Sequence, residues 1–212
     1  MDLFFPLPSG CPLCRTPGAS GVCPRCRAEL FLDTADACRK CGRPQPGPVG
    51  LCLACWRRYP PFDRARAVGP YAGRLREALL RFKAGGETWL AEPLGELLAG
   101  RLLSDFFPPD LVVPVPAHPR KRRERGFNQA ELLATALCRR LDLTLAAGAL
   151  SRRVGALPQA GLTGPEREEN AAGAFHATSL CSLRGKRILL VDDIYTTGAT
   201  ASACTEALLS AG

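Results

Sequence analysis

The sequence predicts an α/β fold in which a mostly parallel sheet is flanked by helices, preceded by a small cysteine-rich module. Apolar strand-like runs alternate with helix-forming runs after residue 60, and this order is typical of a parallel sheet with helical crossovers. Four C-x-x-C pairs crowd the start of the chain. The length of 212 residues has room for both parts. Prolines at 60 and 61 mark the boundary, giving a module over residues 1–60 and a domain over 61–212.

The cysteine-rich module has the spacing of a metal-binding segment. Each C-x-x-C pair can offer two thiolates to one tetrahedral ion, and two pairs complete a Cys₄ site. Because the module has few apolar residues, metal binding has to supply its folding free energy. Four thiolates per ion leave no open position for catalysis. We therefore expect two structural zinc ions, held by Cys11, Cys14, Cys23, Cys26, Cys38, Cys41, Cys52 and Cys55.

Two arrangements of these cysteines are compatible with the sequence. In the sequential one, the first two pairs bind one ion and the last two pairs bind the other. In the cross-braced one, the first pair joins the third and the second joins the fourth. Short gaps between pairs suit compact ribbons, so we expect the sequential arrangement. Three further cysteines stand alone, and we expect burial for Cys138, Cys181 and Cys204.

The elements of the domain follow from hydrophobic spacing and from Pro and Gly punctuation. A helix is expected to bury Leu75, Leu79 and Phe82 and to end near Gly85. Further helices are expected over 91–103, 129–141 and 201–209, and strands over 65–71, 111–115, 173–177 and 186–191. Residues 116–128 read as a long basic loop, and residues 151–172 as a polar, mobile flap.

Residues 188–200 join a buried strand to a helix through two acidic residues and a small-residue loop. In open α/β sheets, ligands bind at the carboxyl ends of strands, where Asp192 and Asp193 lie. The carboxylates can accept hydrogen bonds from ribose hydroxyls. The N–H groups of the loop and the dipole of the next helix favour a phosphate. The segment therefore predicts a phosphorylated-sugar site, with a phosphate loop of Thr196, Thr197, Gly198, Ala199 and Thr200.

This segment resembles the phosphoribosyl diphosphate (PRPP) loop of type I phosphoribosyltransferases. The resemblance implies a type I phosphoribosyltransferase-like sheet and a PRPP ligand bound with Mg²⁺, which bridges pyrophosphate and ribose hydroxyls. Asp192 and Asp193 are then the catalytic candidates, because carboxylates there can stabilise an oxocarbenium-like charge at C1 of the ribose.

Further ligand candidates lie outside this segment. Arg125, Gly126 and Asn128 end the basic loop, where they can meet the pyrophosphate; the alternative is a solvated turn with Asn128 as an N-cap. Lys83 is placed to meet a phosphate, and a helix C-terminal cation is its alternative. In the flap, the candidates are Gln159, Arg167 and Asn170.

The chain carries a formal net charge of +8, with a local basic run at residues 120–123. That run is either a solvated surface or a nucleic-acid contact, with Trp56 and Phe127 as the aromatic residues on which bases could stack. No apolar run is long enough to cross a membrane, and the first residues do not form a signal peptide. We therefore expect a cytoplasmic protein without membrane insertion.

The order of motifs along nearly the whole chain resembles the ComF (competence protein F-like, GntX-like) family. The shared parts are the four C-x-x-C pairs, Tyr71, Leu75, Phe82, Lys83 and Gly85, residues 113–116, 125–129 and 158–162, Arg167, Asn170, Ala174, Phe175, and residues 191–200. The resemblance implies a double zinc-ribbon module joined to a phosphoribosyltransferase domain. It also implies DNA uptake in natural transformation, with single-stranded DNA as ligand and a helicase-like translocase as partner.

The chain departs from the family pattern in two places. Gly155 and Leu157 stand where the family usually has an Arg and a Thr before the flap, and this departure argues against substrate binding by the flap. Family chains usually continue with another strand after Gly212, so we expect a truncated chain or a sheet lacking its last strand. Two functions stay open: a DNA-uptake protein that binds PRPP, and an active phosphoribosyltransferase (a pentosyltransferase) with an unidentified acceptor.

Overall fold

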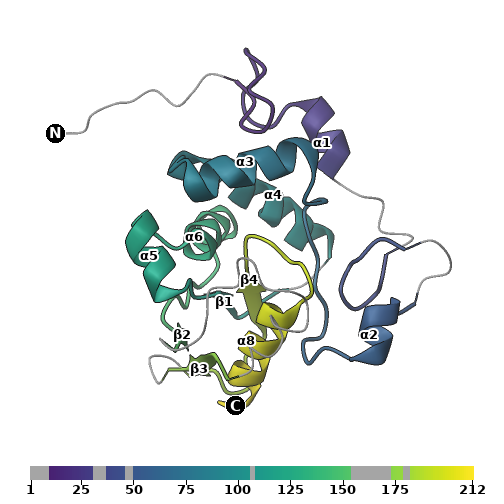
Figure 1. The fold of residues 1–212 in the computed structure, drawn as a ribbon, viewed down its shortest axis with the longest axis vertical. Coiled ribbons are helices and arrows are strands. Elements are labelled where there is room, and N and C mark those ends of the chain that lie inside the picture. Colours follow the sequence, from purple (N-terminus) through teal and green to yellow (C-terminus); the bar gives the residue numbers. More distant parts are fainter. Residues whose placement is uncertain (1–9, 31–36, 46–49, 106–107, 154–172, 179–181) are drawn as a thin grey trace.

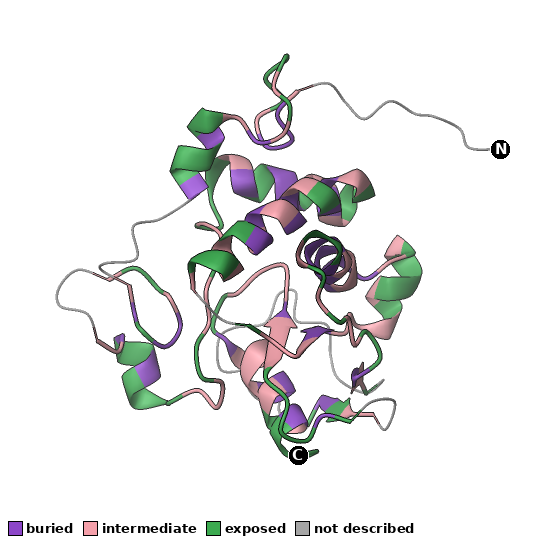
Figure 2. Cartoon of the chain, turned by 180° about the vertical axis from the view of Figure 1, so that it is seen from behind, coloured by how far each residue is buried: buried purple, intermediate pink, exposed green. Residues whose placement is uncertain are grey.

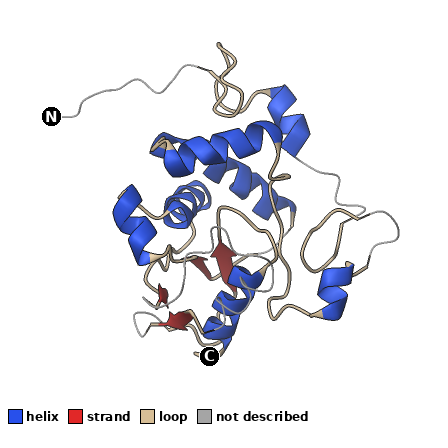
Figure 3. Ribbon diagram, in the orientation of Figure 1, coloured by secondary structure: helices blue, strands red, loops and turns tan. Residues whose placement is uncertain are grey.

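The computed structural model describes residues 10–30, 37–45, 50–105, 108–153, 173–178 and 182–212 (Figure 1). The described part is mixed α/β, with short strands set among longer helices (Figure 3). Its helices are α1 (Pro24–Leu30), α2 (Leu53–Arg57), α3 (Gly73–Ala84), the 3₁₀ turn η2 (Thr88–Leu90), α4 (Ala91–Ser104), α5 (Pro119–Arg125), α6 (Gln129–Leu141) and α8 (Ala199–Leu209). Its strands are β1 (Leu111–Pro114), β2 (Leu150–Arg152), β3 (Phe175–Ala177) and β4 (Ile188–Val191).

Strands β1 and β4 form a small parallel sheet, with Val112 opposite Leu189 and Val113 opposite Leu190. Residue Leu145 extends it by a parallel bridge to Val112. The main-chain N–H of Val115 donates to the carbonyl oxygen of Val191 at 2.9 Å. Because parallel strands end at the same edge, the segments that follow β1 and β4 lie side by side.

The parallel sheet separates two apolar cores. Successive side chains of a strand point to opposite faces. Val112 therefore packs into one core with residues of α3, α4 and α6, while Val113 packs into the other with residues of β2, β3 and α8. Buried positions lie where helices and strands face one another (Figure 2). The alternation explains why this strand sequence is apolar at successive positions.

Helices α4 and α6 pack very closely. A Cβ added at Gly95 would lie 2.5 Å from the Cβ of Ala136, so only glycine fits at that position. Helix α3 buries Leu75, Leu79 and Phe82, as predicted from their spacing. The predicted helices over 91–103, 129–141 and 201–209 are confirmed as α4, α6 and α8.

Two predicted elements were wrong. Residues 65–71 form no strand; the N–H of Ala65 donates instead to the carbonyl oxygen of Lys40 in the cysteine-rich module, at 2.7 Å. Residues 116–128 are not a continuous loop, because they contain α5. This helix has no apolar periodicity. It is capped by His118, whose Nδ1 accepts from the N–H of Arg120, and it carries an ion pair between Arg120 and Glu124.

Residues 154–172, which contain Gly155, Leu157 and the candidates Gln159, Arg167 and Asn170, lie outside the described residues. The strands that border this segment, β2 and β3, pair antiparallel, so the predicted flap was wrong at Ser151 and Arg152, which belong to β2. Cys138 and Cys204 are buried as predicted, whereas Cys181 also lies outside the described residues. Among the described helices, none is both long and apolar enough to cross a membrane.

Candidate functional site

The eight paired cysteines form two four-cysteine clusters. The first cluster is Cys11, Cys14, Cys23 and Cys26, and the second is Cys38, Cys41, Cys52 and Cys55; in each, the Sγ atoms all lie within 4.8 Å of one another. The Sγ–Sγ distances of Cys14–Cys23 and Cys41–Cys52 are both 3.7 Å. Tetrahedral Zn²⁺ with four Zn–S bonds places its sulfurs about 3.8 Å apart. The clusters therefore fit two structural zinc ions, and the sequential arrangement is confirmed.

The two clusters are built alike. In each, the main-chain N–H of the third cysteine donates to the Sγ of the first, at 3.4 Å for Cys23 to Cys11 and 3.3 Å for Cys52 to Cys38. In each, the residue after the second cysteine, Arg15 or Gly42, has a left-handed backbone conformation with positive φ. A short helix, α1 or α2, begins directly after the third cysteine. The module is thus a structural repeat of two metal-binding units.

The carboxyl end of β4 brings Asp193 to Lys83. Lys83 lies in the last turn of α3, and its Nζ is 2.7 Å from Oδ2 of Asp193. The side chain of Asp193 is 10% exposed and that of Lys83 is 24% exposed. An ion pair this poorly solvated depends on both partners, because either charge alone would lack compensation. Two residues that the sequence indicated from separate motifs therefore meet in one site.

Asp192 lies beside this ion pair and has a different electrostatic environment. Its Oδ1 accepts a hydrogen bond from the main-chain N–H of Asp193 at 2.8 Å. Burial, with the neighbouring charge of Asp193, raises the pKa of Asp192 to about 8, although that N–H and the Lys83 cation act in the opposite direction. The site thus places one carboxyl group that pairs with a cation beside a second carboxyl group whose pKa is raised by burial.

The loop after the acidic pair leads directly into the N-terminus of α8. Gly198 occupies the N-cap position with φ 86°, which favours glycine. The hydroxyl of Thr197 accepts from the N–H of Ala199 at 3.3 Å, while Thr196 and Thr197 are exposed. The first N–H groups of a helix have no partner within it, so this end of α8 presents donors beside Asp192 and Asp193.

The segment after β1 reaches the same sheet edge. Arg125 ends α5 and is half-buried, and Gly126 caps that helix with φ 83°. Asn128 is buried, and its Nδ2 donates to the carbonyl oxygen of Val115 at 3.1 Å. Its side chain thus fixes the loop to the end of β1 and makes no N-cap hydrogen bond to α6. Within the described part of the chain, no ion pair joins Arg125 to the two aspartates.

Comparison with known proteins places this chain in a family. Residues 1–56 match the family model of the double zinc ribbon domain. The DNA utilization protein YhgH of Escherichia coli K12 is 30% identical to this chain, over 97% of the chain and 93% of the relative. Competence protein ComFC of Bacillus subtilis 168 is 32% identical, over 90% of the chain and 79% of the relative. The chain belongs to the ComF family.

A further ComF relative is Competence protein F of Haemophilus influenzae Rd, which is 28% identical over 91% of the chain and 86% of the relative. The family resemblance drawn from the motifs is thus confirmed. No solved structure matches the chain. The amino-terminal match also agrees with the two ComF cysteine clusters, because its residues include all eight metal ligands.

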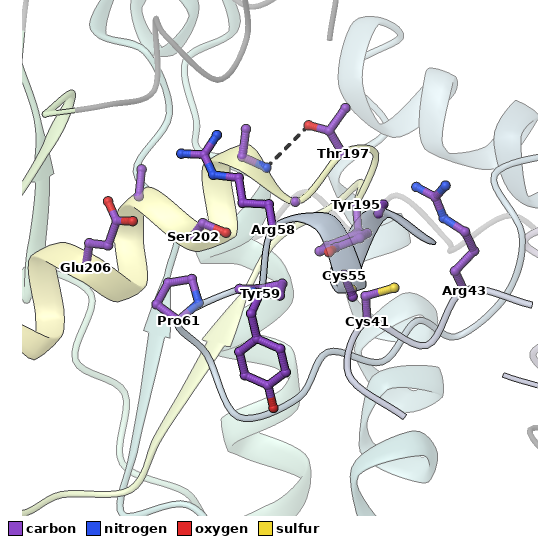
Figure 4. Close-up of a pocket in the computed structure, with 15 residues that line it drawn as sticks. Cys41, Arg43, Cys55, Arg58, Tyr59, Pro61, Tyr195, Thr197, Ser202 and Glu206 are labelled. Atoms are coloured by element: carbon purple, nitrogen blue, oxygen red, sulfur yellow. Dashed lines mark hydrogen bonds between the residues drawn. The ribbon is translucent and has the colours of Figure 1, made fainter. Parts of the chain in front are cut away.

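Parts of the ComF site were missed from the sequence. A cavity of about 260 Å³ lies beside Asp192 and Asp193, and its wall comes from leucines of α3, α4 and α6, from residues 65–71, and from Tyr195. A second cavity of about 120 Å³ separates the second cluster from the N-terminus of α8 (Figure 4). Tyr195 lines both cavities. In the sequence it is an aromatic residue close after the acidic pair and directly before the threonines, and this position was the one sign of the cavities that the sequence offered.

Proposed function

We propose that this chain acts in DNA uptake during natural transformation, binds PRPP with Mg²⁺ after β4 and handles single-stranded DNA. The observation that carries the proposal is the convergence of Lys83, Asp192, Asp193 and the N-terminus of α8 at one sheet edge. The names of the relatives, competence and DNA utilization proteins, support the process. The family resemblance alone suggests a helicase-like translocase as partner.

The ligand roles follow from the chemistry of each group. The carboxylates of Asp192 and Asp193 accept hydrogen bonds from the ribose hydroxyls, and the loop 196–200 donates to the 5′-phosphate. Lys83 and Arg125 supply positive charge toward the pyrophosphate. Mg²⁺, when bound with PRPP, would neutralise phosphate charge at this site.

Single-stranded DNA is proposed to contact the second cysteine unit. Helix α2 and its C-terminal side expose Trp56 (74%) and Tyr59 (63%), with exposed Arg57 and Arg58 between them. Exposed aromatic rings next to cations suit stacked bases and a phosphate backbone. The other aromatic candidate, Phe127, is half-buried, and its ring centroid lies 6.1 Å from that of Phe82.

The basic helix α5 is a weaker candidate for the DNA contact. Glu124 lies 2.8 Å from Arg120 and 3.2 Å from Lys121, and Arg122 lies 3.9 Å from Glu131. These acidic partners reduce the positive potential of the run that the sequence singled out. The aromatic and basic residues of α2 therefore support the DNA proposal better than α5 does.

A second candidate function is phosphoribosyl transfer to an acceptor. The observation that favours it is the 260 Å³ cavity beside the two aspartates, whose wall is formed largely by Leu75, Leu79, Leu94, Leu98 and Leu133. Apolar cavities with a few polar groups at one side are typical of small-molecule sites. In this reaction the bond from C1 to pyrophosphate breaks and the bond from C1 to the acceptor forms. The acidic pair, once Asp192 has released its proton, stabilises the positive charge that develops on the ribose.

Calorimetry with PRPP and Mg²⁺ tests the ligand site. Asp192→Asn/Asp193→Asn is expected to lose binding. The matched control is Asp110→Asn, which changes a carboxylate that precedes β1 and pairs with Arg187. Equal affinity of wild type and the double variant would contradict the site. Turnover of isotope-labelled PRPP with a panel of bases separates the two functions, because only a transferase releases pyrophosphate on adding its acceptor.

A further inference from the structure

The two cysteine clusters have the same construction but pack against different parts of the domain. The first cluster packs on helices α3 and α4, where Arg81 donates to the carbonyl oxygen of Pro12 at 2.5 Å and Arg15 lies 2.7 Å from Glu87. The second cluster packs against Tyr195, which belongs to the ligand loop after β4. Among the described residues, it is therefore the second cluster that packs against the residue preceding the loop proposed to bind PRPP.

Tyr195 connects the second cluster to the start of α8. Its side chain packs on the four cysteines, and its ring meets Phe62 edge-on, with centroids 6.4 Å apart and an interplanar angle of 79°. The hydroxyl lies against Gly198, so close that a Cβ at position 198 would collide with it. One rigid side chain thus spans from a metal cluster to the N-cap of the phosphate-binding helix.

Arg43 gives the loop a second attachment to the same cluster. The main-chain N–H of Cys38 donates to the carbonyl oxygen of Arg43 at 2.8 Å, so the fold around the metal ligands fixes this residue. The guanidinium of Arg43 in turn donates to the carbonyl oxygen of Thr196 at 3.5 Å. This bond holds the backbone of the loop on the side that faces the cysteine-rich module.

The smaller cavity shows how the second unit and α8 face one another (Figure 4). Cys41, Cys55 and Arg58 line it from the cysteine-rich module, while Thr197 and Ser202 line it from the loop and α8. The loop is therefore held between the sheet and the second cluster. A change in the fold of this unit would alter the walls of the cavity and the position of the loop.

We propose that the second four-cysteine cluster, when it holds zinc, positions the phosphate loop through Tyr195 and Arg43, so that zinc at this cluster and PRPP at the loop stabilise each other's binding. This inference rests on the proposed function. Tyr195 is a positioning residue here, because it acts through the loop.

The coupling has a direct physical cause. Without metal, the second unit has little apolar core of its own, so its fold and the surface under Tyr195 are lost together. The loop then stays connected to β4 but loses its contacts through Tyr195 and Arg43. Part of the free energy of PRPP binding is then spent on ordering the loop, so the affinity for PRPP falls. By thermodynamic linkage, PRPP must stabilise zinc at the second cluster by the same factor. The first cluster contacts neither residue and is expected to be independent.

Matched cysteine variants test the proposal in the full chain. Cys52→Ser removes the third cysteine of the second cluster, and Cys23→Ser removes the third cysteine of the first. The two cysteines occupy equivalent positions in their clusters. In calorimetry with Mg–PRPP, Cys52→Ser is expected to weaken binding by about tenfold or more, a factor within the usual range of coupling. Cys23→Ser is expected to change the affinity by no more than about twofold, as for an independent site.

Zinc release gives a readout that does not depend on activity. A chromophoric chelator in excess follows the zinc that remains in each cysteine variant. Saturating Mg–PRPP is expected to slow release from Cys23→Ser, which keeps the second site, and to leave release from Cys52→Ser unchanged. Free Mg²⁺ alone is the control. Tyr195→Ala is expected to keep two zinc ions per chain, lose PRPP affinity and abolish the slowing. Leu103→Ala, at an exposed apolar position of α4, is the control and should keep the zinc ions, the PRPP affinity and the slowing.

The outcomes separate this inference from the proposed function. If wild type binds no PRPP, the ligand site fails and the coupling fails with it. If wild type binds PRPP but zinc release from the second cluster is the same with and without it, the ligand site stands and the coupling is wrong. Tyr195→Ala with wild-type affinity and two zinc ions would likewise overturn the positioning role, without any change to a metal ligand.

Discussion

The Nζ of Lys83 lies 2.7 Å from Oδ2 of Asp193, which joins the end of α3 to the end of β4. Lys83 lies in the last turn of a helix early in the domain, and Asp193 follows strand β4 near the end of the chain. The pair fixes the acidic residue at the sheet edge and brings a cation to the same place. Several expected properties of the protein depend on this arrangement.

Lys83→Met is expected to lower the free energy of unfolding by about 1–3 kcal/mol, because Asp193 then loses its cation in a poorly solvated position. Urea denaturation measures the change. Lys186→Met, at an exposed position, is the control and should stay within about 0.5 kcal/mol of wild type. Adding Asp193→Asn should recover part of the loss, and strictly additive effects would contradict a direct pair.

The raised pKa of Asp192 predicts a specific pH dependence. The folded protein holds a proton on Asp192 that the unfolded chain releases above its ordinary pKa of 3.8, so this residue lowers stability progressively as pH rises from there toward its folded pKa of about 8. Asp192→Asn removes this effect. Its stability relative to wild type should therefore increase between about pH 6 and about pH 8.5 in zinc-containing buffer.

Asp110→Asn is the matched control for this pH series. Hydrogen bonds and the charge of Arg187 lower the pKa of Asp110, so its carboxylate is ionised in the folded and the unfolded chain throughout that window. The stability difference between this variant and wild type should stay constant with pH. Parallel curves for the two variants would show that Asp192 is not the group that titrates.

Gly198→Ala is expected to destabilise the protein by about 1–3 kcal/mol more than Gly86→Ala. Both glycines have positive φ, but a Cβ meets the Tyr195 hydroxyl at position 198 and nothing within 4 Å at position 86. The control thus measures the backbone strain alone, about 1–2 kcal/mol. Tyr195→Phe should recover part of the Gly198→Ala loss; no recovery would place the collision elsewhere.

Trp56→Ala is expected to weaken binding of a labelled oligothymidylate by about 1–3 kcal/mol per stacked base, because the exposed indole offers a stacking surface beside Arg57 and Arg58. Fluorescence anisotropy at fixed salt measures the affinity. Leu53→Ala changes an exposed apolar residue of the same helix and should have little effect. If Arg122→Ala/Arg123→Ala costs more than Trp56→Ala, the DNA contact lies on α5 instead.

Local patterns in the sequence determined much of the fold. Leucine spacing predicted helices α4 and α6, and Gln129 and Leu141 were predicted as the ends of α6. The order of apolar strand, acidic pair, threonines and glycine predicted the ligand loop. These signals are readable because each element is set by residues close in sequence and by burial of one regular face.

Where the signal was not local, the sequence failed. Helix α5 was missed because it has no buried apolar face, and a cap and an ion pair contribute to its stability. Residues 65–71 have the composition of a strand, but a strand forms only where a neighbouring strand accepts its main-chain hydrogen bonds. In this segment the N–H of Ala65 donates to Lys40 of the cysteine-rich module instead. Asn128 occupies the predicted N-cap position of α6, but its amide donates to the carbonyl oxygen of Val115 and does not cap the helix, a contact that the sequence did not indicate.

The sequence by itself determined the two four-cysteine clusters and the strand–loop–helix segment after β4, because C-x-x-C spacing and the order of apolar strand, small-residue loop and helix are local signals. Only the tertiary structure decided that Lys83 neutralises Asp193 and that Tyr195 rests on the second cysteine cluster. Both contacts join distant segments whose approach depends on the packing of the whole core. A sequence motif specifies which groups are present, and the fold specifies which charges and rings they meet.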